Sequence, residues 1–351
     1  MSGPHRQSGP LTPALSPTVE SSPKATPNVG ERGQNLVKDL EGILYGVAPQ
    51  GSVAVHPRSQ FFTVSVPSTH DNALMLLPHT DIAARLDFVL ALYPAAAKFV
   101  LDYFESGSLD VEWKADQTPV TRADRGAEEL LRNHLSARFP QDAILGEESG
   151  ETPGTSGYRW VLDPVDGTKS FVSGVPLFGM LIGLQYHGEC VAGVCGFPAL
   201  NAVVYARQGQ GTWRKCGDAV PVRCHVRQCP ELSQAVFCFT SSGGWDSAGQ
   251  WETFARLTRA TRLSRGWGDC YGHVLVATGR ADVMVDPALA VWDAAALIPI
   301  VTEAGGHFVD WTGQQTVDGG NGISVIPELR SEVLRVIQDP TAQFEAKHGL
   351  D

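Results

Sequence analysis

The chain has 351 residues, of which 43% are hydrophobic, and a formal net charge of −11 at pH 7. An acidic chain lacks the basic surface that nucleic-acid binding needs, so we expect no nucleic-acid partner. It has no run of about 18 apolar residues, so we expect neither a membrane span nor a membrane partner. The seven cysteines form no C-x-x-C pair, and their odd number favours reduced thiols in a cytoplasmic protein over a disulfide framework.

The first 74 residues are expected to form an N-terminal extension that is disordered or poorly ordered. Residues 1–35 are rich in Pro, Ser, Gly and Thr, a composition typical of disorder, and nothing there has the pattern of a signal peptide. The stretches 35–45 and 60–66 could form one short helix and one strand. It also stays open whether translation begins at Met75.

Residues 75–217 are expected to form the first folded half, with helices over an antiparallel sheet. Apolar residues recur at helical spacing from His79 to Glu105, and again from Thr121 to Phe139. Short alternating or apolar runs, most of them separated by Gly or Asn turns, predict strands. These runs are Val111–Lys114, Val175–Gln185, Cys190–Phe197, Ala202–Ala206 and Gly211–Arg214.

Residues 218–351 are expected to form the second half, with a boundary near Gly217. Strand and helix patterns alternate here, which predicts a layered α/β arrangement with helices on both faces of a sheet. The expected strands are Gln234–Thr240, Ala281–Val285 and Gly322–Ile326, and the expected helices are Ser247–Thr258, Gly268–Gly279, Val291–Ala304 and Pro327–Ile337.

The most informative segment is Trp160-Val-Leu-Asp-Pro-Val-Asp-Gly-Thr-Lys169. An apolar strand, Tyr158–Leu162, leads into two carboxylates three residues apart, and Gly167-Thr168 can open a helix. Hard oxygen ligands beside free backbone N–H groups suit a Mg²⁺ ion that holds a phosphate. The spacing differs from the Asp-x-Asp of phosphatases that form an aspartyl-phosphate. A purely structural turn is the plainer alternative for this motif alone.

Two further segments supply carboxylates at strand and helix ends. Ala143-Ile-Leu-Gly-Glu-Glu-Ser149 is a short apolar strand that ends in Glu147 and Glu148, and Asp293 lies near the start of an apolar helix that Gly-Gly follows. Asp293 by itself is more typical of a helix cap. Together with Asp163 and Asp166, these residues could converge into the oxygen-rich set that a multi-metal site requires.

With these motifs, the chain resembles the inositol monophosphatase family of Mg²⁺-dependent phosphatases, from Pro78 to Gln338. The resemblance implies that family's α-β-α-β-α sandwich, an α/β fold. It also implies a phosphoric monoester hydrolase, a small-molecule phosphomonoester as substrate, and a homodimer. Three segments are most similar to its histidinol-phosphatase branch, namely Gln117–Asp124, Thr168–Gly179 and Arg265–Tyr271.

The resemblance assigns the metal ligands residue by residue. Glu147, Asp163 and the Val165 carbonyl would hold one Mg²⁺, and Asp163 would bridge to a second ion that Asp166 and Asp293 also bind. A third ion would bind Glu147 through waters, which gives two to three ions per site. The physical need is independent of the family, because a phosphate dianion facing several carboxylates is repelled unless cations intervene.

The same resemblance gives the catalytic and phosphate-binding groups. Asp124 and Thr168, with Glu147 beside them, would orient the attacking water, and the Gly167 and Thr168 amides would bind phosphate oxygens. No Cys or His lies in the motifs, so direct attack by water is favoured over a covalent intermediate. The expected substrate-binding residues are Glu147, Val165, Asp166, Gly167, Thr168, Arg265, Asp286 and Asp293.

L-Histidinol phosphate, which carries a phosphate, an ammonium and an imidazole, is the expected substrate. Asp286 lies where the family places an acid that contacts the substrate, Asp269 adds a second acid, and Arg265 stands where this branch carries a substrate-binding Arg. Surface or turn roles are the alternatives for Asp286 and Arg265. The inositol branch usually shows small residues where Gly268-Asp269 stands, which favours histidinol phosphate.

The roles of several residues, and the class of protein, each have two interpretations. Lys114 is either a residue near the metals or an exposed strand end, and Glu148 is either a support of the site or a surface acid. His187, His225 and His273 have no ligand spacing and are assigned to core or surface. The alternative activity is an inositol-1-phosphate or broad sugar monophosphatase, and the remote alternative is a non-catalytic interaction protein on this fold.

Overall fold

The structure, a computed structural model, describes residues 69–106, 111–113 and 119–341. The helix predicted at 35–45, the strand predicted at 60–66, the disorder predicted for residues 1–35 and the placement of Lys114 lie outside these residues. The expected division near Gly217 stays a prediction. The short strand β10 (Val222–Cys224), which follows Gly217, still belongs to the first of the two large sheets.

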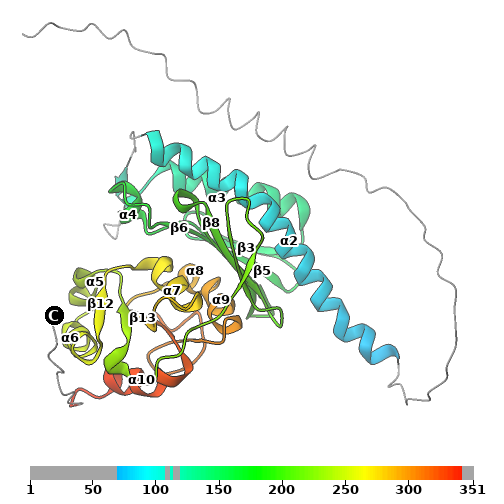
Figure 1. Cartoon of the computed structure of the whole chain (residues 1–351). Coiled ribbons are helices and arrows are strands. Elements are labelled where there is room, and N and C mark those ends of the chain that lie inside the picture. Colours follow the sequence, from blue (N-terminus) through cyan, green and yellow to red (C-terminus); the bar gives the residue numbers. More distant parts are fainter. Residues whose placement is uncertain (1–68, 107–110, 114–118, 342–351) are drawn as a thin grey trace, which may run out of the picture. The chain divides into compact units, whose positions relative to one another are not determined.

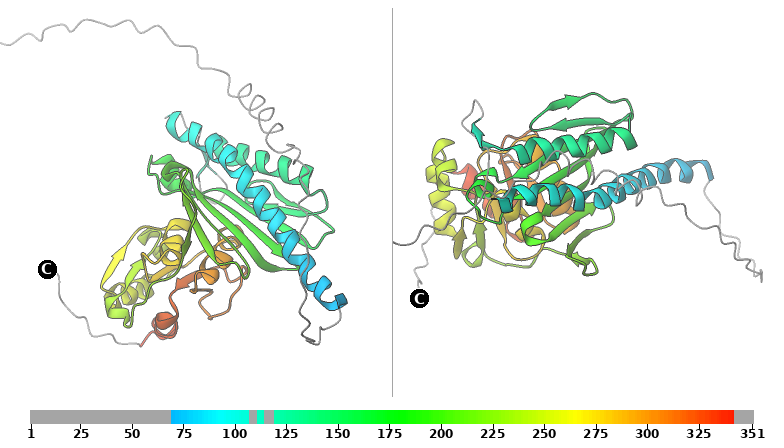
Figure 2. Two further views of the ribbon diagram at one scale, coloured as in Figure 1. Left: turned by 45° about the vertical axis from the view of Figure 1, so that its right-hand side comes forward. Right: turned by 90° about the horizontal axis from the view of Figure 1, so that it is seen from above.

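Two helices form the first layer. Helix α2 (Thr69–Ser106) and helix α3 (Arg122–Arg138) contact each other and lie over one face of the large sheet (Figures 1 and 2). Helix α3 begins at a capping box, in which the Thr121 hydroxyl accepts from Ala123 N and Asp124 bonds back to the Thr121 amide. Strands β1 (Glu112–Trp113) and β2 (Pro119–Val120) form a short pair before it. Both predicted helices of this half are confirmed.

The large sheet has eight strands in the order β10-β9-β8-β7-β6-β5-β3-β4. Its neighbours are antiparallel except for β3 and β5, whose parallel pairing brings the carboxyl ends of both strands to one edge. The strands besides β10 are β3 (Ala143–Gly146), β4 (Gly150–Thr152), β5 (Tyr158–Asp166), β6 (Gly179–Tyr186), β7 (Glu189–Phe197), β8 (Ala202–Arg207) and β9 (Thr212–Cys216).

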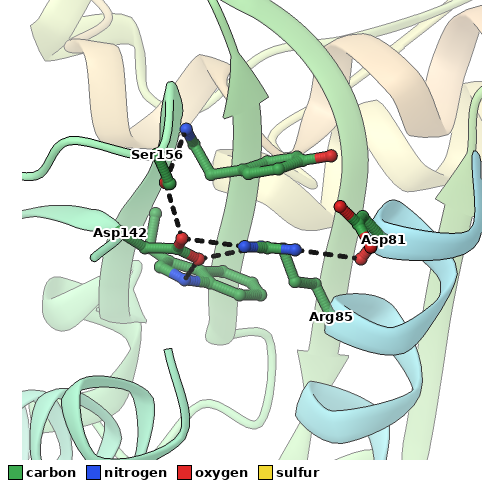
Figure 3. Close-up of polar contacts among 6 residues, drawn as sticks. Asp81, Arg85, Asp142 and Ser156 are labelled. Atoms are coloured by element: carbon green, nitrogen blue, oxygen red, sulfur yellow. Dashed lines mark hydrogen bonds and ion pairs between the residues drawn. The ribbon is translucent and has the colours of Figure 1, made fainter. Parts of the chain in front are cut away.

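One buried carboxylate fastens α2 to this sheet. Asp142 accepts hydrogen bonds from the Arg85 guanidinium at 2.8 and 2.9 Å, from Ser156 Oγ at 2.7 Å and from Trp160 Nε1 at 3.0 Å (Figure 3). The Arg85 guanidinium also lies 3.7 Å from the centre of the Tyr158 ring. A buried charge that is paired and fully hydrogen-bonded in this way is tolerated in a protein interior.

The second sheet has five strands in the order β12-β11-β13-β15-β14, with both parallel and antiparallel pairs. Strand β13 is the central strand of this sheet. It ends at Asp286, so this acid lies at the carboxyl end of the strand. The strands are β11 (Val236–Cys238), β12 (Leu263–Arg265), β13 (Val283–Asp286), β14 (His307–Val309) and β15 (Gly322–Val325).

Three helices lie between the two sheets, and others cover the far side of the second sheet (Figure 1). Helices α7 (Asp269–Ala277) and α9 (Leu297–Glu303) contact strands of both sheets, and α8 (Val291–Ala294) contacts β5 and β6 of the large sheet. The layers are therefore α-β-α-β-α, and the predicted fold class is confirmed. The remaining elements are α4 (Thr168–Val172), α5 (Ser242–Ser247), α6 (Trp251–Ala260), α10 (Arg330–Gln338) and the 3₁₀ turns Pro198–Leu200, Leu232–Gln234 and Pro327–Leu329.

Two predicted helices differ from those observed. The helix expected at Val291–Ala304 is interrupted between α8 and α9, although Ala295 and Ala296 keep helical backbone angles. The reason is Pro299, which has no N–H to donate to the Ala295 carbonyl four residues earlier. The helix expected at Ser247–Thr258 begins only at Trp251, as α6, because Gly249 takes a left-handed φ of 68° before it. Helix α5, which ends at Ser247, was not predicted.

Candidate active site

Three carboxylates converge where the large sheet meets the central helices. Asp163 and Asp166 lie at the end of β5, and Asp293 lies in the first turn of α8. One carboxylate oxygen from each lies within 4.8 Å of the others. The pairing of β5 with β6 is irregular between Asp163 and Asp166, which leaves both side chains near the strand end.

Each of the three carboxylates accepts one backbone N–H. Val165 N donates to Asp163 Oδ1 at 3.1 Å, Cys270 N donates to Asp166 Oδ2 at 2.6 Å, and Ala290 N donates to Asp293 Oδ2 at 2.7 Å. No ion pair of these three with Lys, Arg or His is found among the residues described by the structure. Three neighbouring acids are thus held in place without a cationic side chain as partner.

Burial and mutual repulsion raise the pKa of all three acids. Burial, then the charges of Glu147 and Asp166, raise the pKa of Asp163 well above its usual value. Burial and the charges of Asp269 and Asp293 do the same to the pKa of Asp166. The pKa of Asp293 rises to about 7, chiefly through burial. Such a set is unfavourable by itself and fits divalent cations, because hard carboxylate oxygens are the ligands that Mg²⁺ takes.

Glu147 stands at the turn after β3, half-buried, and its amide donates to the Leu162 carbonyl at 3.1 Å. The turn is held by Glu128 of α3, a fully buried residue whose carboxylate accepts from the Glu148 and Ser149 amides at 2.8 and 3.0 Å. Arg132 pairs with Glu128 at 2.7 Å. A Cβ added at Gly146 would lie 2.4 Å from the Glu128 carboxylate carbon, so glycine is needed there. Glu128 is therefore a residue that fixes the Glu147 turn.

The turn after Asp166 leads directly into the short helix α4. Gly167 has a φ of 80°, a left-handed angle that glycine adopts freely, and it precedes α4. Thr168 Oγ1 donates to the Val165 carbonyl at 3.1 Å. Asp124 is buried, and its Oδ2 accepts from Thr121 Oγ1 at 2.5 Å and from Thr121 N at 2.8 Å. Burial, followed by smaller effects that include the Glu147 charge, raises the pKa of Asp124.

A cavity of about 180 Å³ adjoins the acidic cluster. It is lined by Asp166, Asp293, Lys169, Thr240, Asp269 and Asp286, with His273, Ser241, Gly244, Cys270, Pro287, Ala288, Leu289 and Leu297 completing the wall. The cavity thus includes one lysine and an acidic wall beside the cluster, formed by Asp269 and Asp286. It is large enough for a small organic group attached to a phosphate.

A hydrogen-bonded network runs through the acidic wall of this cavity. Asp286 is 3% exposed and accepts from Thr240 Oγ1 at 2.6 Å, while its other oxygen lies 3.2 Å from His273 Nε2. His273 Nδ1 lies 2.7 Å from Ser324 Oγ. The same Thr240 oxygen accepts from Asp269 N at 2.9 Å. Thr240 therefore links both acids of the wall.

The structure brings most predicted site residues together, with exceptions. Arg265 is exposed at the end of β12, donates to the Ser264 carbonyl at 2.8 Å, and does not line the cavity. Of the three histidines assigned to core or surface, His273 is buried and reaches the cavity wall. Glu128, Thr240 and His273 were missed as contributors because they stand outside the motifs. The sequence held only weak signals for them. Glu128 is an acid inside a predicted helix, Thr240 ends a predicted strand, and His273 follows Gly268-Asp269 by four residues.

Comparison with known proteins identifies the class and then the family. A histidinol-phosphatase of Chlorobaculum parvum is 45% identical over 238 residues, 68% of this chain and 90% of the relative. One of Streptomyces coelicolor is 40% identical, over 71% of this chain and 94% of the relative. A solved inositol monophosphatase from Zymomonas mobilis, 31% identical, superposes with a TM-score of 0.64 over 73% of this chain and 98% of its own. The protein is thus a phosphoric monoester hydrolase.

The family model of the inositol monophosphatase family matches residues 83–339, and the chain belongs to this family. The prediction made from the three motifs is confirmed. No helix among the described residues is long and apolar enough to cross a membrane.

Proposed function

We propose that the protein hydrolyses L-histidinol phosphate to L-histidinol and phosphate with the help of Mg²⁺. The observation that carries this proposal is the acidic cavity beside the three-carboxylate cluster. A substrate with a phosphate at one end and cationic nitrogens at the other matches this arrangement, because metal ions would receive the phosphate and acids would receive the nitrogens. The two relatives named histidinol-phosphatase support the same substrate.

Asp163, Asp166 and Asp293, with Glu147 and the Val165 carbonyl, would hold two to three Mg²⁺ ions. When bound, these ions offset the acids' charge, polarise the phosphoryl group and make a water molecule more acidic. The oxygens of the three aspartates already lie within 4.8 Å of one another, so little rearrangement is needed to share ions.

The chain itself orients the reactants. The Gly167 and Thr168 amides stand at the start of α4 and would bind phosphate oxygens, and Asp166 and Asp293 flank the same space. Because the Thr168 hydroxyl donates to the Val165 carbonyl, its oxygen can accept a hydrogen bond from water. Asp124 and Glu147 are the acids proposed to receive the proton of that water. The proposed reaction is direct attack by this water on phosphorus, in line with the leaving oxygen.

Asp286 and Arg265 complete the proposed substrate-binding set with different support. Asp286 lies on the cavity wall, which agrees with a role toward the cationic end. Arg265 is exposed and bonded to its neighbour's carbonyl, so its side chain has to turn to meet a substrate. The proposal also includes a homodimer and a cytoplasmic location, the latter supported by seven free cysteines.

A second candidate substrate is an inositol or sugar monophosphate, which the similarity to a solved inositol monophosphatase favours. An assay of phosphate release in the presence of Mg²⁺ distinguishes the two candidate substrates. It measures kcat/KM for histidinol phosphate and for inositol 1-phosphate. A preference of about tenfold or more for histidinol phosphate, equal to about 1.4 kcal/mol of selectivity, supports the proposal. The reverse preference contradicts it.

A further inference from the structure

We infer that the Asp269 carboxylate contacts the cationic group of the substrate and makes the enzyme select cationic over neutral phosphomonoesters. Asp286 then acts with Thr240 as a supporting frame behind it. This inference rests on the proposed function, because it concerns the organic end of the substrate in the same cavity.

Asp286 is already held by groups of the chain itself. Both of its oxygens are engaged, one by the Thr240 hydroxyl at 2.6 Å and one by His273 at 3.2 Å. His273 is itself held by Ser324 at 2.7 Å, and only 3% of Asp286 is exposed. A carboxylate that is held on both oxygens and almost fully buried is well placed to orient its neighbours.

Asp269 is in the opposite situation. It lines the same cavity and is only half-buried. Within the described part of the chain, its carboxylate has neither a hydrogen bond nor an ion pair. Lys169 lines the cavity too, but it is exposed and forms no ion pair with Asp269. A carboxylate at a cavity wall without a donor is completed by a ligand that brings N–H groups and positive charge.

The backbone places this side chain at a local cost. Asp269 has a φ of 53°, in the left-handed region that non-glycine residues seldom adopt, and such strain collects at functional sites. Its amide is fixed by Thr240 Oγ1, and the next amide, of Cys270, is fixed by Asp166. Gly268 allows the close approach, since a Cβ there would lie 2.0 Å from Thr240 Cα. The side chain of Asp269 is thus held, on a strained backbone, between the three-carboxylate cluster and the frame formed by Asp286 and Thr240.

The test is Asp269→Asn, which keeps the size of the side chain and tolerates the left-handed backbone. We expect kcat/KM for histidinol phosphate to fall on the order of 10- to 100-fold, as for loss of one charge-assisted hydrogen bond, mostly through KM. kcat/KM for inositol 1-phosphate should fall much less, since this substrate has no cationic group. Asp87→Asn, an exposed residue of α2 outside the cavity, is the matched control and should change neither value.

The frame is tested with Thr240→Val, which removes the hydroxyl that links both acids. Selectivity for the cationic substrate should fall, and Thr240→Ser should restore it, because serine keeps that hydroxyl; a loss of fold alone would lower turnover of both substrates. Equal losses for both substrates in Asp269→Asn overturn the inference. So does a selective loss in Asp286→Asn that is absent from Asp269→Asn.

Failure of the proposed function gives a different result. If the wild-type enzyme releases phosphate from inositol 1-phosphate but not from histidinol phosphate, the proposed substrate is wrong. The inference is then tested with phosphoethanolamine against glycerol phosphate, a cationic and a neutral ester. A loss confined to phosphoethanolamine in Asp269→Asn upholds the role of Asp269, and equal losses reject it.

Discussion

Two buried carboxylate centres in this protein have opposite surroundings. Asp142 accepts four hydrogen bonds, two of them from the Arg85 guanidinium, and it joins α2 to the large sheet. Asp163, buried to a similar degree, accepts one backbone N–H and has Glu147 and Asp166 as charged neighbours. The first centre is complete within the chain, whereas the second is the one that we propose is completed by cations from solution.

The difference shows how one chain separates stability from function. A carboxylate with its own cation contributes to the folded state under all metal conditions. Several carboxylates without a cation destabilise the metal-free protein, and the binding of divalent ions relieves that repulsion. Each centre therefore responds to a different perturbation, and four experiments distinguish them.

The largest effect is expected from Asp163→Asn. This change removes the acid proposed to bridge two ions, so turnover of histidinol phosphate should fall by more than about a hundredfold. The metal-free variant should be as stable as the wild type or more so, since one repelling charge is gone. Turnover with Mg²⁺ and thermal unfolding in EDTA are the two measurements. A variant that keeps more than about a hundredth of the activity would refute the bridging role.

Arg85→Met tests the other centre. Asp142 would keep only Ser156 and Trp160 as side-chain partners, and breaking a buried pair of this kind costs about 3–5 kcal/mol of unfolding free energy. Urea unfolding measures the loss, and kcat/KM of the folded variant should be unchanged. Lys98→Met is the control, because it breaks an exposed pair with Asp102 worth about 0.5 kcal/mol or less. Equal losses in both variants would contradict the comparison.

The metal-free protein should lose stability as the pH rises, and bound Mg²⁺ should offset this loss. Burial raises the pKa of Asp293 and of Asp269 to about 7, whereas an unfolded Asp titrates near about 3.9. Between these values the native state binds protons that the unfolded state lacks, so stability of the metal-free protein falls as pH rises from about 4 to about 7 and levels off above. Unfolding in EDTA at pH 5 to 8 should show this fall, and Mg²⁺ should offset it. The same measurement on Asp163→Asn serves as the reference. If the wild-type protein in EDTA gains stability over this range relative to that variant, the acids do not repel one another as proposed.

The smallest effect is expected from deletion of residues 1–74. Neither carboxylate centre lies in this segment, and the match to the family begins at residue 83. kcat/KM and solubility should therefore be unchanged. A large loss of either would show that the extension belongs to the folded unit.

The sequence by itself determined many of the elements and the acids of the cluster. Alternation and helical spacing predicted α2, α3 and the strands β6 to β9, because burial on one face leaves a periodic trace in the chain. The motifs around Asp163, Asp166 and Asp293 predicted a common cluster, and their oxygens do lie together. These residues stand at element ends, which a local pattern can locate.

Only the tertiary structure decided which acid of the cavity is engaged and which is open. The partners of Asp286 are Thr240, 46 residues earlier, and His273, 13 residues earlier, and neither distance leaves a periodic signal. Asp269 and Arg265 look alike in sequence, as charged residues near a glycine. The fold places Asp269 on the cavity wall, because its amide bonds to Thr240 of a separate segment, and leaves Arg265 exposed at a strand end, where it bonds to its neighbour's carbonyl.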